Sequence, residues 1–140
     1  MIVNDIMSKA PVTVEADDNL WAVKQLFEKT GFHHLIVTEE NKMAGIVSDR
    51  DYLKAISPRI DTPTESAKDI ETLNKSVRQI MTAKVITLET SADVYDAIDI
   101  FNTNKISCIP IVDQDGQALG IVSWRDILRV LAKTRKKPNK

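Results

Sequence analysis

An internal duplication constrains the fold of this chain more than any other feature. Residues 3–8, V-N-D-I-M-S, align with residues 77–82, V-R-Q-I-M-T, at an offset of 74. The heptad G-I-V-S-D-R-D at 45–51 returns as G-I-V-S-W-R-D at 120–126, at an offset of 75. Such self-similarity indicates two copies of one structural unit, and the second copy holds one extra residue at the Asp115-Gly116 turn.

Each copy shows the same order of strand and helix signals. Apolar and β-branched runs predict strands at 11–14, 34–38 and 43–47 in the first copy, and at 85–88, 108–112 and 118–122 in the second. Apolar residues at helical spacing predict a helix after the first strand of each copy, through Leu20, Val23, Leu26 and Phe27, and through Val94, Ala97, Ile98 and Phe101. A last helix is predicted to begin near Ser48 and near Ser123.

The same pattern predicts where these helices end and which side they bury. Asp17 or Asp18, and Ser91, are candidate N-caps of the first helix in each copy. Gly31 and Asn104 are candidate ends of those helices. In the last helices, the residues expected to face inward are Leu53, Ile56, Ile127, Leu128 and Leu131.

The repeated unit is thus β-α-β-β-α, and at about 55 residues it is marginally stable by itself. We therefore expect an α/β (α+β) fold in which two repeats pack with pseudo-two-fold symmetry and form two related clefts. The expected division is a first repeat at 1–62, a linker at 63–76, a second repeat at 77–134 and a basic tail at 135–140.

Composition excludes several classes of function. Nineteen lysines and arginines balance 20 aspartates and glutamates, so the net charge of −1 gives no global attraction to nucleic acid or to anionic membranes. The single cysteine, Cys108, cannot form an internal disulfide and fits a reducing compartment. No apolar run approaches the ~20 residues that span a bilayer, and Asp5 interrupts any signal peptide. A cytoplasmic location is expected.

The duplicated heptads, the I-M-[ST] start of each copy, the G-F-H-H-L segment at 31–35 and the P-I-V-D segment at 110–113 resemble a tandem pair of CBS (cystathionine-β-synthase) domains, or Bateman module. The resemblance covers nearly the whole chain. It implies a regulatory module of the stand-alone type that binds AMP, ADP, ATP or S-adenosylmethionine in its two inter-repeat clefts. It also implies a homodimer and an unknown regulated protein, with no required cofactor.

In this family the aspartate of the heptad, here Asp51 and Asp126, accepts hydrogen bonds from the two ribose hydroxyls. A carboxylate has the two acceptor oxygens that such a diol needs. By itself, an aspartate at the start of a helix more often only stabilises that helix, but the repeated motif favours ligand binding. Ser48 and Ser123 precede these aspartates by three residues, where each can cap the helix, contact ribose or phosphate, or do both.

The resemblance also implies that the start of the middle strand of one repeat faces the ligand held by the other. One cleft would combine Ser48 and Asp51 with Ile106 and Ser107. The second cleft would combine Ser123 and Asp126 with Phe32, His33 and His34. A histidine can pair with phosphate whereas Ser107 can only hydrogen-bond, so the clefts are expected to differ in affinity. Partly buried polar packing explains the histidines equally well.

Other candidates have simpler alternatives. Arg50 and Arg125 could reach a polyphosphate, although surface salt bridges are the more ordinary role. Val12 and Ile86, with Ile106, could line the adenine, and packing in the core explains them equally well. Trp124 replaces Asp49 in the second heptad and could stack on a neighbour, line the cleft or lie in a dimer interface, for which helix faces with Tyr52 or Trp21 are candidates. Asp49 adds negative charge beside Asp51, which disfavours a triphosphate there.

No catalytic or metal-binding motif is present in the sequence. It lacks a G-x-x-x-x-G-K-[ST] loop, a G-x-S-x-G elbow and any Cys/His metal spacing, so we expect no enzyme and no metal. Cys108 is expected to be a buried, inert thiol. The alternative to a ligand sensor is a constitutive protein-interaction scaffold with degenerate clefts. Nucleic-acid binding through the basic tail at 133–140 ranks third, because short charge runs are usually solvated chain ends, and an enzyme ranks last because no nucleophile–base pair is evident.

Overall fold

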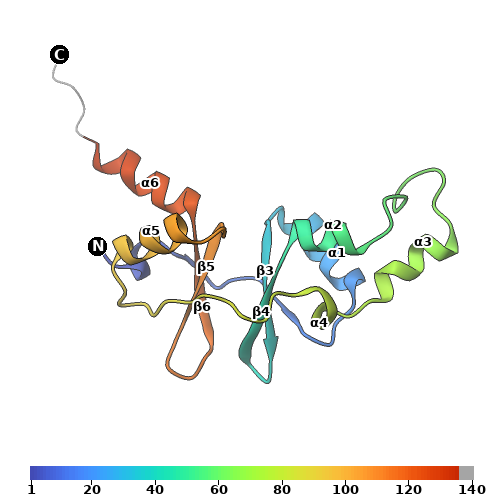
Figure 1. Ribbon diagram of the computed structural model, residues 1–140, viewed down its shortest axis with the longest axis horizontal. Coiled ribbons are helices and arrows are strands. Elements are labelled where there is room, and N and C mark those ends of the chain that lie inside the picture. Colours follow the sequence, from blue (N-terminus) through green and yellow to red (C-terminus); the bar gives the residue numbers. More distant parts are fainter. Residues whose placement is uncertain (136–140) are drawn as a thin grey trace, which may run out of the picture. The chain divides into compact units, whose positions relative to one another are not determined.

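The structure is a computed structural model that describes residues 1–135 (Figure 1). The chain forms two compact units, which we name by the repeat that supplies most of each. The first-repeat unit consists of residues 12–85, and the second-repeat unit consists of residues 1–11 together with residues 86–135. Residues 136–140 of the predicted basic tail lie outside the described part of the chain. Sequence repeats and compact units therefore divide the chain differently, because the beginning of each repeat belongs to the unit of the other. The repeat boundaries themselves stay a prediction.

The first-repeat unit is built on a three-stranded sheet in the order β2-β3-β4. Strand β2 (Thr13–Glu15) runs parallel to β3 (His34–Glu39), and β4 (Lys42–Ser48) runs antiparallel to β3. The helices of this unit are α1 (Leu20–Thr30), α2 (Asp49–Ala55), α3 (Ala67–Glu71) and α4 (Val77–Ile80), with a 3-10 turn η2 at Thr72–Asn74. The tight turn between β3 and β4 places Glu40 and Asn41 at positive φ.

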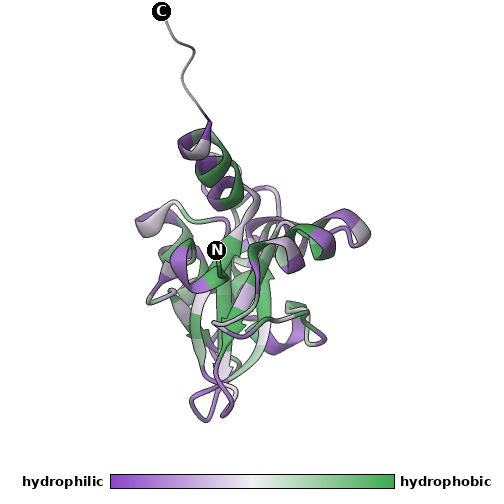
Figure 2. Ribbon diagram, turned by 90° about the vertical axis from the view of Figure 1, so that its left-hand side faces the viewer, coloured by the Kyte–Doolittle hydropathy of each residue, from purple (hydrophilic) through white to green (hydrophobic). Residues whose placement is uncertain are grey.

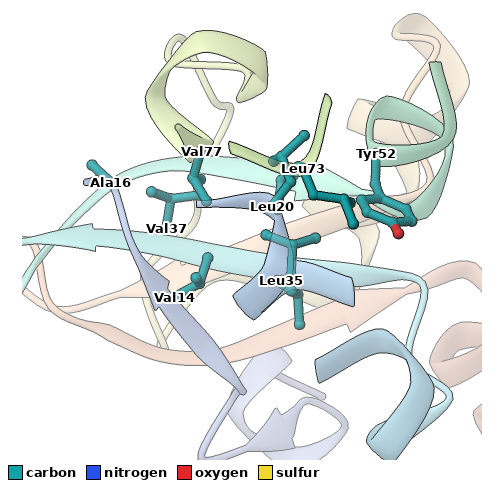
Figure 3. Packing of buried hydrophobic residues seen from close by; sticks show 10 residues of the cluster. Val14, Ala16, Leu20, Leu35, Val37, Tyr52, Leu73 and Val77 are labelled. Carbon is teal, nitrogen blue, oxygen red and sulfur yellow. The ribbon is translucent and has the colours of Figure 1, made fainter. Parts of the chain in front are cut away.

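Buried side chains from separate parts of the chain form the core of this unit (Figure 3). Leu35 and Val37 from β3 and Leu20 from α1 are fully buried. Leu73 from η2 and Val77 from α4 complete the same cluster, so the segment between the repeats contributes to the core.

The second-repeat unit has a three-stranded sheet in the order β1-β6-β5. Strand β1 (Ser8–Lys9) and strand β5 (Cys108–Val112) both run antiparallel to β6 (Ala118–Ser123). The remaining elements are a 3-10 turn η1 (Val3–Asp5), helix α5 (Val94–Thr103) and helix α6 (Trp124–Thr134). Figure 2 shows the strands as predominantly hydrophobic, whereas α6, the helix nearest the C-terminus, carries both hydrophobic and hydrophilic residues.

The middle and last strands and the last helices confirm the predicted order of elements, but the first strand of the second repeat does not form. Residues 85–88 make only a parallel bridge between Leu88 and Ile111. The Val112 N–H donates to Leu88 O at 3.0 Å, and the Leu88 N–H donates to Pro110 O at 3.2 Å. Two hydrogen bonds at one residue do not extend into a ladder, so the prediction of a strand at 85–88 was wrong.

Helix ends differ from the prediction at two positions. Asn19 caps α1, in place of Asp17 or Asp18, by accepting a hydrogen bond from the Ala22 N–H. Asp93 caps α5 in place of Ser91. Gly31 ends α1 in the left-handed conformation (φ 69°), as predicted. Asn104 ends α5 as predicted, although its backbone is extended.

Several apolar residues of the last helices are exposed rather than buried. The side chains of Leu53, Leu128 and Leu131 are more than half exposed, so the prediction that they face inward was wrong. Ile127 is buried, as predicted. Helical spacing identifies an apolar face but not which part of it meets the sheet, and here only one part of the face does.

Two glycines explain why the I-M-[ST] motif and the heptad occur together. A Cβ at Gly45 would lie 2.6 Å from Thr82 O, and a Cβ at Gly120 would lie 2.7 Å from Ser8 O and 2.6 Å from Met7 Sδ. Thr82 and Ile46 exchange backbone hydrogen bonds of 2.9 and 3.0 Å, and Ser8 pairs with Ile121. Each glycine therefore accommodates the I-M-[ST] segment of the other repeat against its strand.

Candidate functional site

Asp51 lies in the first turn of α2, directly after β4, and forms a reciprocal cap with Ser48. The Asp51 N–H donates to Ser48 Oγ at 3.0 Å, and the Ser48 N–H donates to Asp51 Oδ2 at 2.9 Å. The structural role considered for this aspartate is therefore real. The cap uses only one carboxylate oxygen, and a carboxylate has lone pairs for several further donors. Capping and ligand binding are compatible at Asp51.

Asp126 repeats this arrangement at the start of α6. Its Oδ2 accepts from the Ser123 N–H at 2.8 Å and from Ser123 Oγ at 3.1 Å. Among residues 1–135, Asp126 is the one charged residue that is buried, with 7% of its surface exposed. Its Oδ1 lies 3.6 Å from the Arg129 Nη1. Sequence reasoning missed Arg129, although a basic residue three positions after an aspartate on a helix signals such a pair.

The two histidines lie beside the Asp51 cap in the same unit. His34 of β3 is opposite Ser48 of β4. Partial burial lowers the pKa of His34, which favours its neutral form at physiological pH. His33 is exposed, and its Nδ1 lies 2.8 Å from Asp49 Oδ2, while the Asp49 N–H donates to His33 O at 2.9 Å. His33 thus holds Asp49 through both its side chain and its backbone.

The structure distributes the remaining predicted site residues between the two units. The first-repeat unit contains Val12, Phe32, His33, His34, Ser48, Arg50 and Asp51. The second-repeat unit contains Ile86, Ile106, Ser107, Ser123, Arg125 and Asp126. The pairing of Asp51 with Ile106 and Ser107, and of Asp126 with Phe32, His33 and His34, stays a prediction.

Some of these residues have an evident packing role. Val12 packs against the core of its unit, and Ile106 packs against the core of the other unit, as ordinary core packing would require. Phe32 and Ile86 are exposed. Trp124 is half exposed and contacts Phe101 edge-on, with ring centroids 6.3 Å apart.

The arginines of the heptads differ from expectation. Arg50 and Arg125 are exposed, and neither forms an ion pair with any residue of the described part of the chain. Within the described residues they therefore do not form the surface salt bridges that are the more ordinary role of such arginines. Each arginine is the residue before a capped aspartate, and its guanidinium is exposed to solvent.

Helix faces with Tyr52 or Trp21 were the predicted dimer interface, and the prediction for Tyr52 was wrong. Tyr52 is buried, with its ring centroid 6.0 Å from that of Phe27. Trp21 is partly exposed. The strongly exposed apolar side chains of the last helices are instead Leu53, Trp124, Leu128 and Leu131.

Cys108 is buried in β5, and burial raises the pKa of its thiol to about 12. Because reaction requires the thiolate, only about one thiol in ten thousand is reactive at pH 8. We therefore expect iodoacetamide to leave the folded protein unmodified at pH 8 and to label it rapidly in urea. Rapid alkylation of the native protein, followed by mass spectrometry, would contradict this assignment.

Residues 1–135 contain no group of three His, Cys, Asp or Glu side chains close enough to hold a metal ion. Over the same residues, no helix combines the length and apolar character needed to cross a membrane.

Two α/β units with the same capped aspartate at a strand–helix junction define a tandem duplicated module. The CBS domain family model matches residues 3–58 and 77–133, so the chain belongs to the CBS domain family.

Relatives of known sequence include chains of similar and of much greater length. Uncharacterized protein MJ1426 of Methanocaldococcus jannaschii is 31% identical over an alignment of 154 positions, gaps included, which covers 94% of this chain and 91% of the relative. The inosine-5′-monophosphate dehydrogenase of the same organism is 28% identical over 127 residues, which cover 90% of this chain but only 23% of the enzyme. The chain thus also matches parts of larger proteins.

Solved structures share the fold over almost the whole chain. The CBS domain pair of protein MJ0100, in complex with 5′-methylthioadenosine and S-adenosyl-L-methionine, superposes with a TM-score of 0.77 at 28% identity, covering 96% of this chain and 98% of the other. The structure of CBSX2 in complex with AMP has a TM-score of 0.80 at 22% identity, covering 96% and 98%, and shows the likeness of the fold alone.

Proposed function

We propose that this chain is a regulatory module that binds adenosine-containing ligands and passes their presence on to a partner protein. The observation that carries the proposal is the duplicated cap, in which Asp51 and Asp126 each use one carboxylate oxygen for the helix start. The ligands of the MJ0100 pair, 5′-methylthioadenosine and S-adenosyl-L-methionine, share the adenosine that such a carboxylate would hold by its ribose hydroxyls.

The proposed role is binding rather than catalysis. The adenosyl compound acts as a regulatory ligand, and its effect on a partner requires different affinities for two conformations of the module. The regulated partner and the cytoplasmic location stay predictions.

A thermal-shift series tests the proposal on purified protein stripped of co-purified nucleotide. The ligands are AMP, ATP, 5′-methylthioadenosine and S-adenosylmethionine, with GTP as the control for base recognition. A ligand at 100 times its dissociation constant adds roughly 2.7 kcal/mol to the stability of the folded state. We expect a shift with adenosine compounds and none with GTP. Well-folded protein that shifts with none of them would instead support the constitutive scaffold.

We further propose that the module is a homodimer that covers the apolar surface of α6. Trp124, Leu128 and Leu131 are spaced as i, i+4 and i+7 on this helix and are each more than half exposed. A groove of about 260 Å³ lies beside them, lined by Ile98, Phe101, Asn102, Trp124, Ile127 and Leu128. An isologous contact would bring the same surface of a second copy against it.

Replacing Leu128 by glutamate tests the dimer. Because Leu128 is exposed in the single chain, Leu128→Glu should leave the fold intact while placing two like charges in the contact. We expect a dimeric mass for the native chain and a monomeric mass for the variant by light scattering. Gln114→Glu, at an exposed residue of the turn between β5 and β6, is the control for one added surface charge away from the groove. A native chain that is monomeric at all concentrations would contradict the proposal.

A further inference from the structure

We infer that the two aspartate sites select different adenosine compounds. The Asp126 site favours adenosine with a 5′-phosphate, and the Asp51 site favours adenosine whose 5′ group carries no negative charge. This inference rests on the proposed function and assigns a ligand class to each of its two sites.

The difference begins at the residue between the serine and the arginine of each heptad. In the first-repeat unit this residue is Asp49, whose side chain is 44% exposed. In the second-repeat unit it is Trp124, which is uncharged and 54% exposed. Each is the first residue of its helix. It therefore lies between the capping serine and the aspartate that is proposed to bind the ribose hydroxyls.

Asp49 is fixed in this place. Its Oδ2 lies 2.8 Å from His33 Nδ1, and its N–H donates to His33 O at 2.9 Å. The contact with His33 Nδ1 holds the carboxylate, and the backbone bond holds the residue that carries it, so the carboxylate cannot easily turn away from an approaching phosphate. Trp124 is held by the edge-on contact with Phe101, so the equivalent place in the other unit is filled without charge.

The environment of the aspartate itself differs in the same sense. The Arg129 guanidinium lies 3.6 Å from Asp126 Oδ1 and partly neutralises that carboxylate. Lys54 occupies the equivalent position in the first repeat, and within residues 1–135 it forms no ion pair. The exposed Arg50 and Arg125 are common to both sites and cancel in the comparison.

One additional carboxylate sets the size of the effect. We take a phosphate dianion about 8 Å from this carboxylate in a water-like medium. Repulsion then weakens the binding of the phosphate-bearing ligand roughly fourfold at about 0.01 M ionic strength and about twofold at about 0.15 M. The uncharged ligand 5′-methylthioadenosine should feel neither the carboxylate nor the salt. AMP and 5′-methylthioadenosine are therefore a matched pair of probes, because they share adenosine and differ in the charge of the 5′ group.

Two variants isolate the sites, each measured by calorimetry with both probes at low and at moderate salt. Asp51→Ala leaves the Asp126 site, and Asp126→Ala leaves the Asp51 site. We expect the preference for AMP over 5′-methylthioadenosine to be about fourfold greater in Asp51→Ala at low salt and to narrow as salt is added. If Asp126→Ala fails to fold, Asp126→Asn is used in its place, because the asparagine keeps an oxygen for the helix cap.

A second substitution assigns the cause. Asp49→Asn, made in the Asp126→Ala background, should raise the affinity for AMP about fourfold at low salt and leave that for 5′-methylthioadenosine unchanged. Glu71→Gln removes an exposed carboxylate from α3 of the same unit and should change neither. Equal preferences in the two single-site variants would overturn the inference while the proposed function stands. Failure of the native chain to bind either probe would overturn both.

Discussion

Replacing Gly45 by alanine is expected to lower the free energy of unfolding by about 2–3 kcal/mol. The new Cβ would lie 2.6 Å from Thr82 O and 3.0 Å from Met81 Sδ. Thr82 O is a backbone atom that accepts the Ile46 N–H at 3.0 Å, so it cannot move without loss of that hydrogen bond. Urea denaturation followed by circular dichroism measures the change, and Gly120→Ala should behave similarly.

Gly31→Ala is the matched control for the steric effect. Gly31 has a positive φ of 69°, but an added Cβ meets nothing within 4 Å. Its cost is therefore only that of the left-handed backbone, about 1 kcal/mol. If Gly45→Ala were no more destabilising than Gly31→Ala, this would contradict the close packing of the I-M-T segment at 80–82 against Gly45.

Removing the carboxylate of Asp51 should weaken adenosine binding at that site about a hundredfold. Two hydrogen bonds from ribose hydroxyls to a charged acceptor together contribute about 3 kcal/mol, which corresponds to roughly a hundredfold in affinity. The helix cap is lost as well, so Asp51→Ala should also cost about 1 kcal/mol of stability. Calorimetry with 5′-methylthioadenosine in the Asp126→Ala background, where only the Asp51 site is left, gives the affinity, and urea denaturation gives the stability.

Asp69 provides a control that separates these two effects. It forms the same reciprocal cap with Ser66 at the start of α3, with the Ser66 N–H donating to Asp69 Oδ2 at 2.8 Å. Asp69→Ala should therefore destabilise the same unit without affecting ligand affinity. An equal loss of affinity in Asp51→Ala and Asp69→Ala would show that binding depends on stability and not on the Asp51 carboxylate.

Local patterns in the sequence predicted those parts of the fold that depend on local chemistry. The strands at 34–38 and 108–112 were predicted because apolar β-branched residues concentrate there, and the caps at Ser48 and Ser123 follow from serine and aspartate three residues apart. The family of the chain followed from motifs repeated at offsets of 74 and 75 residues.

Long-range pairing could not be predicted in this way. The segments at 3–8 and 77–82 are so alike that the sequence does not say which sheet each one joins. In the structure, Ser8 pairs with Ile121, more than a hundred residues away. The strand expected at 85–88 has suitable residues but too few hydrogen-bonding partners beside it.

The candidate site also has features that local sequence predicted and features that it did not. The capped aspartates were recognised from the heptads, and Cys108 was correctly expected to be buried. The exposure of Leu128 and the pairing of Asp126 with Arg129 were not foreseen, because both depend on how α6 lies against its sheet and on side-chain geometry within one helix turn.

The stoichiometry of ligand binding tests the central claim most directly. We would titrate the stripped native chain and the Asp51→Ala/Asp126→Ala double variant with 5′-methylthioadenosine by isothermal titration calorimetry. Two capped aspartates predict two ligand molecules bound per native chain and none by a folded double variant. A double variant that binds the ligand as tightly as the native chain would show that neither aspartate holds it and would contradict the proposed sites.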